Sequence, residues 1–231
     1  MENGGHKMYV TLSADYQSRT AVPSISRPCL SAREAQIKAG AYLFYEGDEV
    51  TWLYQVTSGV LRLTRLLENG RRQVIAFGYP GDVVGFPAGG CHHTDCDALV
   101  DTCLQPYRKS LLENGESDIE LHGELLQAAL SEISAMQDHF MMLGRKSAVE
   151  KVASFLNVLA GRVGRYENGI GKVDLPMRRA DIADFLGLTT ETVSRTLTQM
   201  RKSGIIEIEN IHTVVILRPT ALTSLAQGDE D

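Results

Sequence analysis

Three polar residues in the last quarter of the sequence have the types and the spacing needed to recognise paired bases. Glu191, Ser194 and Arg195 occupy positions i, i+3 and i+4, which share one face of a helix. Arginine donates two hydrogen bonds to O6 and N7 of guanine, glutamate accepts one from N4 of cytosine, and serine does either. The pattern therefore predicts a surface that reads base edges. The alternative is an exposed Glu191–Arg195 ion pair on a solvated helix.

The residues around this trio predict two short helices joined by a tight turn. Residues 179–186 form the first helix, Gly187 supplies the left-handed residue that ends it, and Thr189 or Thr190 caps the second helix. The second helix has apolar residues at i, i+4 and i+7, namely Val193, Leu197 and Met200. Residues 205–217 then form a two-stranded wing that turns near Asn210. This order is typical of a winged helix-turn-helix.

Basic and hydroxyl side chains surround the same segment. Between Arg178 and Lys202 there are five basic and three acidic side chains, although the whole chain has a net charge of -6. Such a local excess predicts contacts with phosphates. The expected DNA-backbone contacts are Arg178, Arg179, Thr189, Thr190, Thr192, Arg201 and Lys202. Thr196 and Thr198 are expected to add hydroxyl contacts, and His212 is expected to be a surface residue.

Composition limits the class of protein. The 231 residues are 43% hydrophobic and 23% charged, which argues against a disordered or collagen-like chain. No stretch reaches the roughly 18 apolar residues of a membrane helix, and no signal peptide is recognisable. We therefore expect a cytoplasmic protein whose four cysteines are thiols.

The region from about residue 41 to 107 has the pattern of a β-roll. Short β-favouring runs alternate with turn signals, and Asn69-Gly70 is the strongest of these. From about residue 120 to 143 the period becomes helical, with a heptad seam formed by Leu126, Ala129, Ile133, Met136, Phe140 and Leu143. This helix either forms a dimer interface or packs on its own β-roll.

The chain is predicted to have four segments and an α+β fold. Residues 1–30 form an arm, 31–118 a β-roll (jelly roll) like a cyclic-nucleotide-binding domain, 119–145 a dimerisation helix, and 146–231 the winged helix-turn-helix unit. Within the last segment, residues 148–163 are expected to be helical and residues 161–171, rich in glycine, to be a loop.

A β-roll with turns at Gly47-Asp48, Gly59 and Gly81-Asp82, followed by a long helix and this helix-turn-helix, resembles the CRP/FNR family of bacterial transcription regulators. Glu-x-x-Ser-Arg on the recognition helix is similar to the FNR and FixK branches. The resemblance implies a homodimeric activator, without enzymatic activity, that contacts RNA polymerase under low oxygen. It also implies a TTGAT-N4-ATCAA-like palindrome in double-stranded DNA, with Arg195 on guanine and Glu191 on the complementary cytosine.

The β-roll lacks the residues that the resemblance would require for two known ligands. Residues 81–103 contain neither glutamate nor arginine, so we expect no cyclic AMP. An iron–sulfur cluster needs four thiolates; Cys103 resembles the family's roll cysteine, but the arm offers only Cys29, so we expect no cluster. Asp95, Asp97 and Asp101 are expected to form a solvated face.

A metal site is the remaining alternative. Cys91, His92, His93 and Cys96, with Cys103 or Cys29, offer soft sulfur and imidazole ligands. They suggest either a metal- or redox-sensing regulator of the same fold or a cupin-like metalloenzyme.

Overall fold

The computed structural model describes residues 34–114, 118–167 and 170–228. The predicted arm, residues 1–30, lies outside the described residues, as does Cys29. The described chain divides into two compact units, with the boundary between Ala135 and Met136. This boundary falls inside helix α2 (Ile119–Arg145), so the predicted segment 119–145 contributes to both units.

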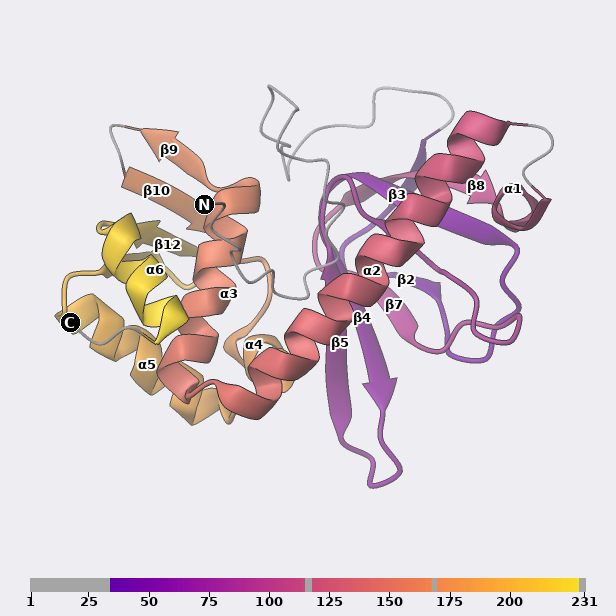
Figure 1. Ribbon diagram of the computed structural model, residues 1–231. Coiled ribbons are helices and arrows are strands. Elements are labelled where there is room, and N and C mark those ends of the chain that lie inside the picture. The colour runs from indigo at the N-terminus through magenta and orange to yellow at the C-terminus, as the bar shows by residue number, and fades with distance from the viewer. Residues whose placement is uncertain (1–33, 115–117, 168–169, 229–231) are drawn as a thin grey trace. The chain divides into compact units, whose positions relative to one another are not determined.

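The first unit is a β-roll made of two antiparallel sheets (Figure 1). One sheet has the order β1-β8-β3-β6 and the other β2-β7-β4-β5. Their strands are β1 (Ala35–Ile37), β2 (Tyr42–Phe44), β3 (Trp52–Ser58), β4 (Leu61–Leu66), β5 (Arg72–Gly78), β6 (Val83–Val84), β7 (Asp95–Ala98) and β8 (Thr102–Arg108). The core between the sheets is apolar and includes Val56, Leu61 and Phe77.

Two glycines explain how the roll strands turn. Gly70 adopts φ 76° at the predicted Asn69-Gly70 turn between β4 and β5, a conformation that costs a residue with a Cβ about 1–2 kcal/mol. Gly59 adopts φ 88° between β3 and β4. A Cβ on Gly59 would lie 2.3 Å from Oγ1 of Thr102 and 2.6 Å from its Cα, so glycine is required there for space as well as for backbone conformation.

Helix α1 (Lys109–Asn114) and the first part of α2 complete this unit. Leu125 of α2 is buried against Leu53 of β3 and Val83 of β6. Helix α2 thus packs on its own β-roll, as one of the two sequence interpretations expected.

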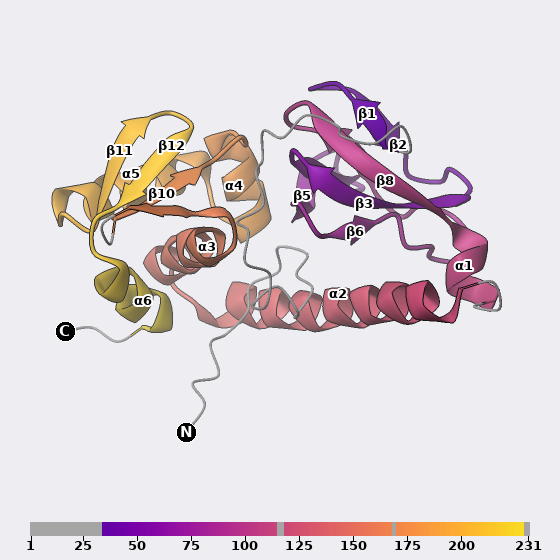
Figure 2. The same cartoon turned by 90° about the horizontal axis from the view of Figure 1, so that it is seen from above.

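The second unit contains the last turns of α2 and the rest of the described chain. Its helices are α3 (Ala148–Val163), α4 (Arg179–Leu186), α5 (Thr190–Lys202) and α6 (Pro219–Gln227). Its sheet has the order β11-β12-β10-β9, formed by β9 (Arg165–Glu167), β10 (Ile170–Asp174), β11 (Ile206–Asn210) and β12 (Thr213–Ile216). Figure 2 shows α6 alongside α3.

The prediction of a loop over residues 161–171 was wrong. Helix α3 continues to Val163, and β9 pairs with β10 from Arg165 opposite Lys172 to Glu167 opposite Ile170. A Cβ on Gly171 would lie 2.8 Å from the ring of Tyr166, so this glycine makes room for an aromatic ring inside a hairpin.

The last turns of α2 belong to the core of the second unit. His139 is buried and stacks on Phe185 of α4, with ring centroids 4.3 Å apart. Burial lowers the pKa of His139 to about 4, with an opposing backbone hydrogen bond at Phe185 and a further lowering by Lys151. The imidazole is therefore neutral at physiological pH.

Candidate nucleic-acid interface

The predicted helix-turn-helix is confirmed as α4, a turn and α5. Gly187 ends α4 in the left-handed conformation, with φ 63°, and its N–H donates to the carbonyl of Ala183. The Thr189 hydroxyl caps α5 by accepting from the N–H of Thr192 at 3.1 Å. Helix α5 buries the predicted stripe of Val193, Leu197 and Met200. The opposite face of α5 is consequently held outward.

Glu191, Ser194 and Arg195 lie together on this outward face. The side chain of Arg195 is 80% exposed and that of Glu191 69% exposed, and Nη2 of Arg195 lies 2.5 Å from Oε1 of Glu191. The Ser194 hydroxyl donates to the carbonyl of Thr190 at 2.8 Å. The ion pair of the alternative interpretation is therefore present, on side chains that are also accessible to a ligand.

The face extends beyond the three predicted residues. An open hollow of about 590 Å³ is lined by Glu191, Ser194, Arg195, Thr198, Gln199, Lys202 and Ser203. For Thr198 the sequence predicted only a hydroxyl contact, and it did not predict Gln199 or Ser203. Thr198 and Gln199 follow Glu191 by seven and eight positions, which is the helical repeat that would have identified both.

The predicted DNA-backbone residues differ in accessibility. Among them, Arg178, Thr189, Thr190, Arg201 and Lys202 are exposed, and Thr192 is half-buried. Arg179 is also half-buried, its Nη1 is fully covered without a hydrogen-bond partner among the described residues, and burial lowers its pKa. Thr196 is only 4% exposed. The expectation that Thr196 contacts DNA was wrong, because its side chain faces the core.

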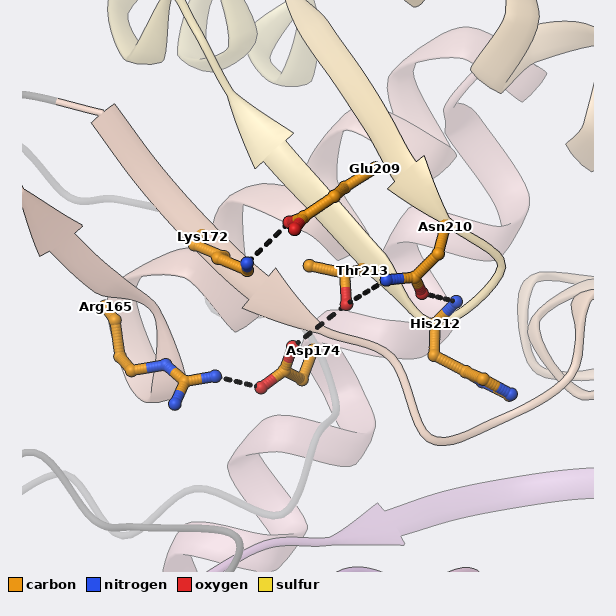
Figure 3. A network of polar contacts seen from close by, with 7 residues as sticks. All are labelled: Arg165, Lys172, Asp174, Glu209, Asn210, His212 and Thr213. Carbon is orange, nitrogen blue, oxygen red and sulfur yellow. Dashed lines mark hydrogen bonds and ion pairs between the residues drawn. The ribbon is translucent and has the colours of Figure 1, made fainter.

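Polar contacts hold the wing strands to their neighbours. Figure 3 shows the residues involved: Arg165, Lys172, Asp174, Glu209, Asn210, His212 and Thr213. Asp174 of β10 accepts hydrogen bonds from Arg165 of β9 and, at 3.2 Å, from the hydroxyl of Thr213 in β12. Lys172 pairs with Glu209 of β11 at 2.5 Å. These contacts cross all four strands, so the wing is fixed to the same sheet that supports α5.

His212 is exposed, as expected for a surface residue. Its N–H donates to Oδ1 of Asn210 at 2.8 Å, which forms the turn between β11 and β12. The turn therefore lies where the sequence placed it.

Comparison with known proteins agrees with this geometry. A family model for a Crp-like helix-turn-helix domain matches residues 150–225, and one for a cyclic nucleotide-binding domain matches residues 34–110. The nitrogen fixation regulation protein FixK of Rhizobium meliloti is 40% identical over 192 residues, which cover 83% of this chain and 86% of that protein. The chain belongs to the CRP/FNR family of transcription regulators.

Two further relatives support membership of the CRP/FNR family. The transcriptional activator protein FnrL of Cereibacter sphaeroides is 34% identical, over 84% of this chain and 80% of that protein. The solved structure of FixK2 from Bradyrhizobium japonicum matches with a TM-score of 0.75 and 36% identity, over 85% of this chain and 98% of that one. The chain is therefore a DNA-binding regulator with an α+β fold.

The heptad seam of α2 lies on a face that is largely open. Phe140 is 78% exposed, and Leu126, Ile133 and Met136 are also exposed, whereas Ala129 and Leu143 are half-buried. Other apolar residues of the same helix, Leu125, Ala135 and Met142, are buried. Helix α2 thus has a buried set of apolar residues and an apolar seam that the described part of the chain leaves largely exposed.

The cysteines and histidines considered as metal ligands have different surroundings. His92 is buried and stacks on Phe44 at 3.6 Å between ring centroids, and burial lowers its pKa. His93 is exposed. Over the described parts of the chain, no group of three or more His, Cys, Asp or Glu residues is arranged to hold a metal ion.

The three described cysteines also differ. Cys91 is a half-buried free thiol, and Cys96 is a fully buried one; burial, with Asp97 and Asp95 nearby, raises the pKa of Cys96. Cys103 is buried and disulfide-bonded. The expectation that every cysteine is a thiol was therefore wrong for Cys103.

The aspartates of the roll do not form one solvated face. Asp97 is only 5% exposed and accepts two hydrogen bonds from Arg62, at 3.0 and 2.8 Å. Asp101 pairs with Lys38 at 2.8 Å, and Asp95 accepts from the N–H of Glu46 at 2.8 Å. The expectation failed for Asp97 because β4 and β7 place Arg62 directly opposite it.

Proposed function

We propose that the protein is a homodimeric transcriptional activator that reads a TTGAT-N4-ATCAA-like palindrome through Glu191, Ser194 and Arg195. The observation that carries this proposal is their common exposed face on a capped helix whose other face is buried. Helices of this motif meet base edges through their N-terminal half, which is where these three residues lie.

Arg195 is assigned to guanine and Glu191 to the complementary cytosine. Arginine offers two donors in a fixed plane that match O6 and N7 of guanine. Glutamate would be repelled by phosphates, so its position on this face suits a base contact better than a backbone contact. Arg201 and Lys202, exposed at the end of α5, supply charge for the phosphates.

The dimer is assigned to the open face of α2. Association buries Leu126, Ile133 and Phe140, and burial of apolar area is the main favourable term in such interfaces. A twofold axis along the paired helices presents two recognition helices. Two half-sites about 34 Å apart then fall in successive major grooves.

We infer further that the protein acts in the cytoplasm, contacts RNA polymerase and needs no cofactor to bind DNA. No arginine is present between Gly81 and Cys103 to neutralise a cyclic phosphate, and Asp97 in this stretch is already paired with Arg62. Among the described residues no helix is both long and apolar enough to cross a bilayer. The resemblance to FixK and FnrL supports a role under oxygen limitation.

Selection of bound sites from random double-stranded DNA tests the proposal, with and without oxygen. We expect the same palindrome to be enriched in both conditions, and the Arg195→Ala variant to lose preference at the guanine. Enrichment of an asymmetric site would contradict the dimer. A palindrome without a guanine opposite α5 would contradict the assignment of Arg195, and enrichment only without oxygen would contradict the absence of an oxygen-sensitive cofactor.

A further inference from the structure

Lys146 holds the C-terminal end of α6, the last described helix. It lies at the junction between α2 and α3, where its backbone N–H donates to the carbonyl of Met142 at 3.1 Å. Its ammonium donates to the carbonyl of Ala226 at 2.6 Å and to the hydroxyl of Ser154 at 2.7 Å. The Ser154 hydroxyl is buried and donates to the same carbonyl at 3.3 Å. Lys146 therefore ties the junction to α6 through a charge-assisted bond.

Arg218 holds the other end of the same helix. It immediately precedes α6, and its guanidinium donates to the carbonyls of Ser203 and Gly204, the first residues after α5. The N–H groups of Leu217 and Arg218 both donate to the carbonyl of Ile205, at 2.9 and 3.2 Å. The end of the recognition helix is thus joined to the start of α6.

Between these two ends, α6 packs along α3. Leu222 and Ala226 are buried, and the hydroxyl of Thr223 donates to Oδ1 of Asn157 in α3 at 3.1 Å. Figure 2 shows the two helices side by side. Helix α6 has nine residues and is about 13 Å long. Lys146 and Arg218 therefore act at opposite ends of it and contact different residues.

We propose that Lys146 and Arg218 are positioning residues for DNA reading, and that α6 is the strut through which the α2–α3 junction fixes the end of α5. This inference rests on the proposed reading of DNA by α5. A base contact requires its side chain within about 0.5 Å of the productive position. A strut at the end of α5 therefore affects specific binding without either residue contacting a base.

A double-mutant cycle tests the strut on the full-length protein with the selected palindrome. We expect Lys146→Met and Arg218→Met each to weaken specific binding about 2- to 30-fold, the range for residues that act without contacting the ligand. The double variant should bind the palindrome no more weakly than the weaker-binding of the two single variants, because either change alone already releases the strut. Two independent stabilising contacts at this separation would instead multiply their effects.

Two further measurements and a control variant separate the strut from other roles. The salt dependence of binding should be unchanged in both variants, whereas loss of a phosphate contact reduces its slope by about one. Lys146→Met should speed amide exchange at Ser203–Ile205 but not in the middle of α3. Lys38→Met, which removes an exposed lysine from the β-roll, is the matched control and should leave DNA binding and exchange unaltered.

Multiplicative effects in the cycle would overturn the proposal, as would unchanged exchange at Ser203–Ile205. A reduced salt slope for Arg218→Met would assign Arg218 to phosphate instead. If Lys146→Met does not fold, Ser154→Ala removes the neighbouring hydroxyl and is measured in the same way. If the unaltered protein selects no palindrome, the proposed function fails, and amide exchange alone then decides whether the strut exists.

Discussion

Arg195 and Glu191 form an ion pair across one turn of α5, although each is assigned to a different base of one pair. An exposed pair at i, i+4 contributes only about 0.3–0.5 kcal/mol. A bidentate contact between arginine and guanine discriminates by about 1–3 kcal/mol. The magnitudes favour exchange of the ion pair for base contacts, so the pair orients both side chains in the free protein without preventing recognition.

Substitution of Arg195 tests this exchange. We expect Arg195→Ala to weaken specific binding by about 1–3 kcal/mol per half-site and to leave non-specific binding nearly unchanged, because a base contact is lost. Fluorescence anisotropy with the palindrome and with scrambled DNA measures both quantities.

Two control substitutions accompany Arg195→Ala. Arg71→Ala removes an exposed arginine from the β4–β5 turn and should have no effect. Lys202→Ala should weaken binding to all sequences equally and reduce the salt slope by about one. Equal losses on palindromic and scrambled DNA for Arg195→Ala would show that Arg195 contacts phosphate.

The open face of α2 predicts the oligomeric state. Ile133→Glu would place two carboxylates against each other in the dimer, and an uncompensated buried charge costs about 3–5 kcal/mol. We expect the dimer dissociation constant to rise about 100-fold or more, as measured by sedimentation equilibrium. Gln127→Glu adds the same charge about 120° around the helix from Ile133 and should leave the dimer intact. If Ile133→Glu remains as dimeric as Gln127→Glu, the interface lies elsewhere.

His139 predicts a pH dependence of stability. Its pKa is about 4 in the folded protein and about 6.5 when unfolded, so the unfolded state binds the proton more tightly. Stability from this group is present above about pH 6.5 and declines as the pH falls towards about 4. The expected decline is on the order of 2–3 kcal/mol.

Comparison with His139→Phe isolates this effect, since phenylalanine keeps a ring against Phe185 but does not titrate. The free energy of unfolding is measured by urea titration followed by circular dichroism. As the pH is lowered from about 7 to about 4.5, the free energy of unfolding of the variant should rise relative to that of the unaltered protein. A constant difference between variant and unaltered protein would show that His139 does not titrate in this range.

Gly59 and Gly47 form a matched pair for the β-roll. Both have positive φ, at 88° and 91°, but only a Cβ on Gly59 meets other atoms within 4 Å. We expect Gly47→Ala to cost about 1–2 kcal/mol from strain and Gly59→Ala about 2–5 kcal/mol from strain and overlap together. Fluorescence of Trp52, which lies in β3, reports unfolding of the roll. Equal costs would show that Thr102 moves aside freely.

The helix-turn-helix was predictable because its signals are local. Gly187 and Thr189 mark the turn, and the outward trio follows directly from helical spacing. Thr196 was misjudged because a hydroxyl was treated as a surface group, although it follows Val193 by three positions and thus shares the buried stripe.

Features that depend on distant partners were not predictable. The burial of Asp97 requires its pairing with Arg62 across β7 and β4, and the burial of His92 requires the ring of Phe44. The glycines of residues 161–171 indicated a loop. The sequence could not show that Gly171 makes room for the Tyr166 ring, because this contact depends on the register of the β9–β10 hairpin. Helix α6 had one local signal, Pro219 at its first turn, but its attachment to Lys146 is a tertiary contact.

The hydrogen bond from Ser194 to Thr190 restricts what this serine can recognise. Its hydroxyl hydrogen is directed along the helix axis, so only oxygen lone pairs face outward. In the major groove, the partners for a lone pair are exocyclic amino groups, N6 of adenine and N4 of cytosine. If Ser194 reads a base as proposed, we expect it to favour amino-bearing bases over keto-bearing ones, because a thymine or guanine at that step would force the hydroxyl to rotate away from its own backbone.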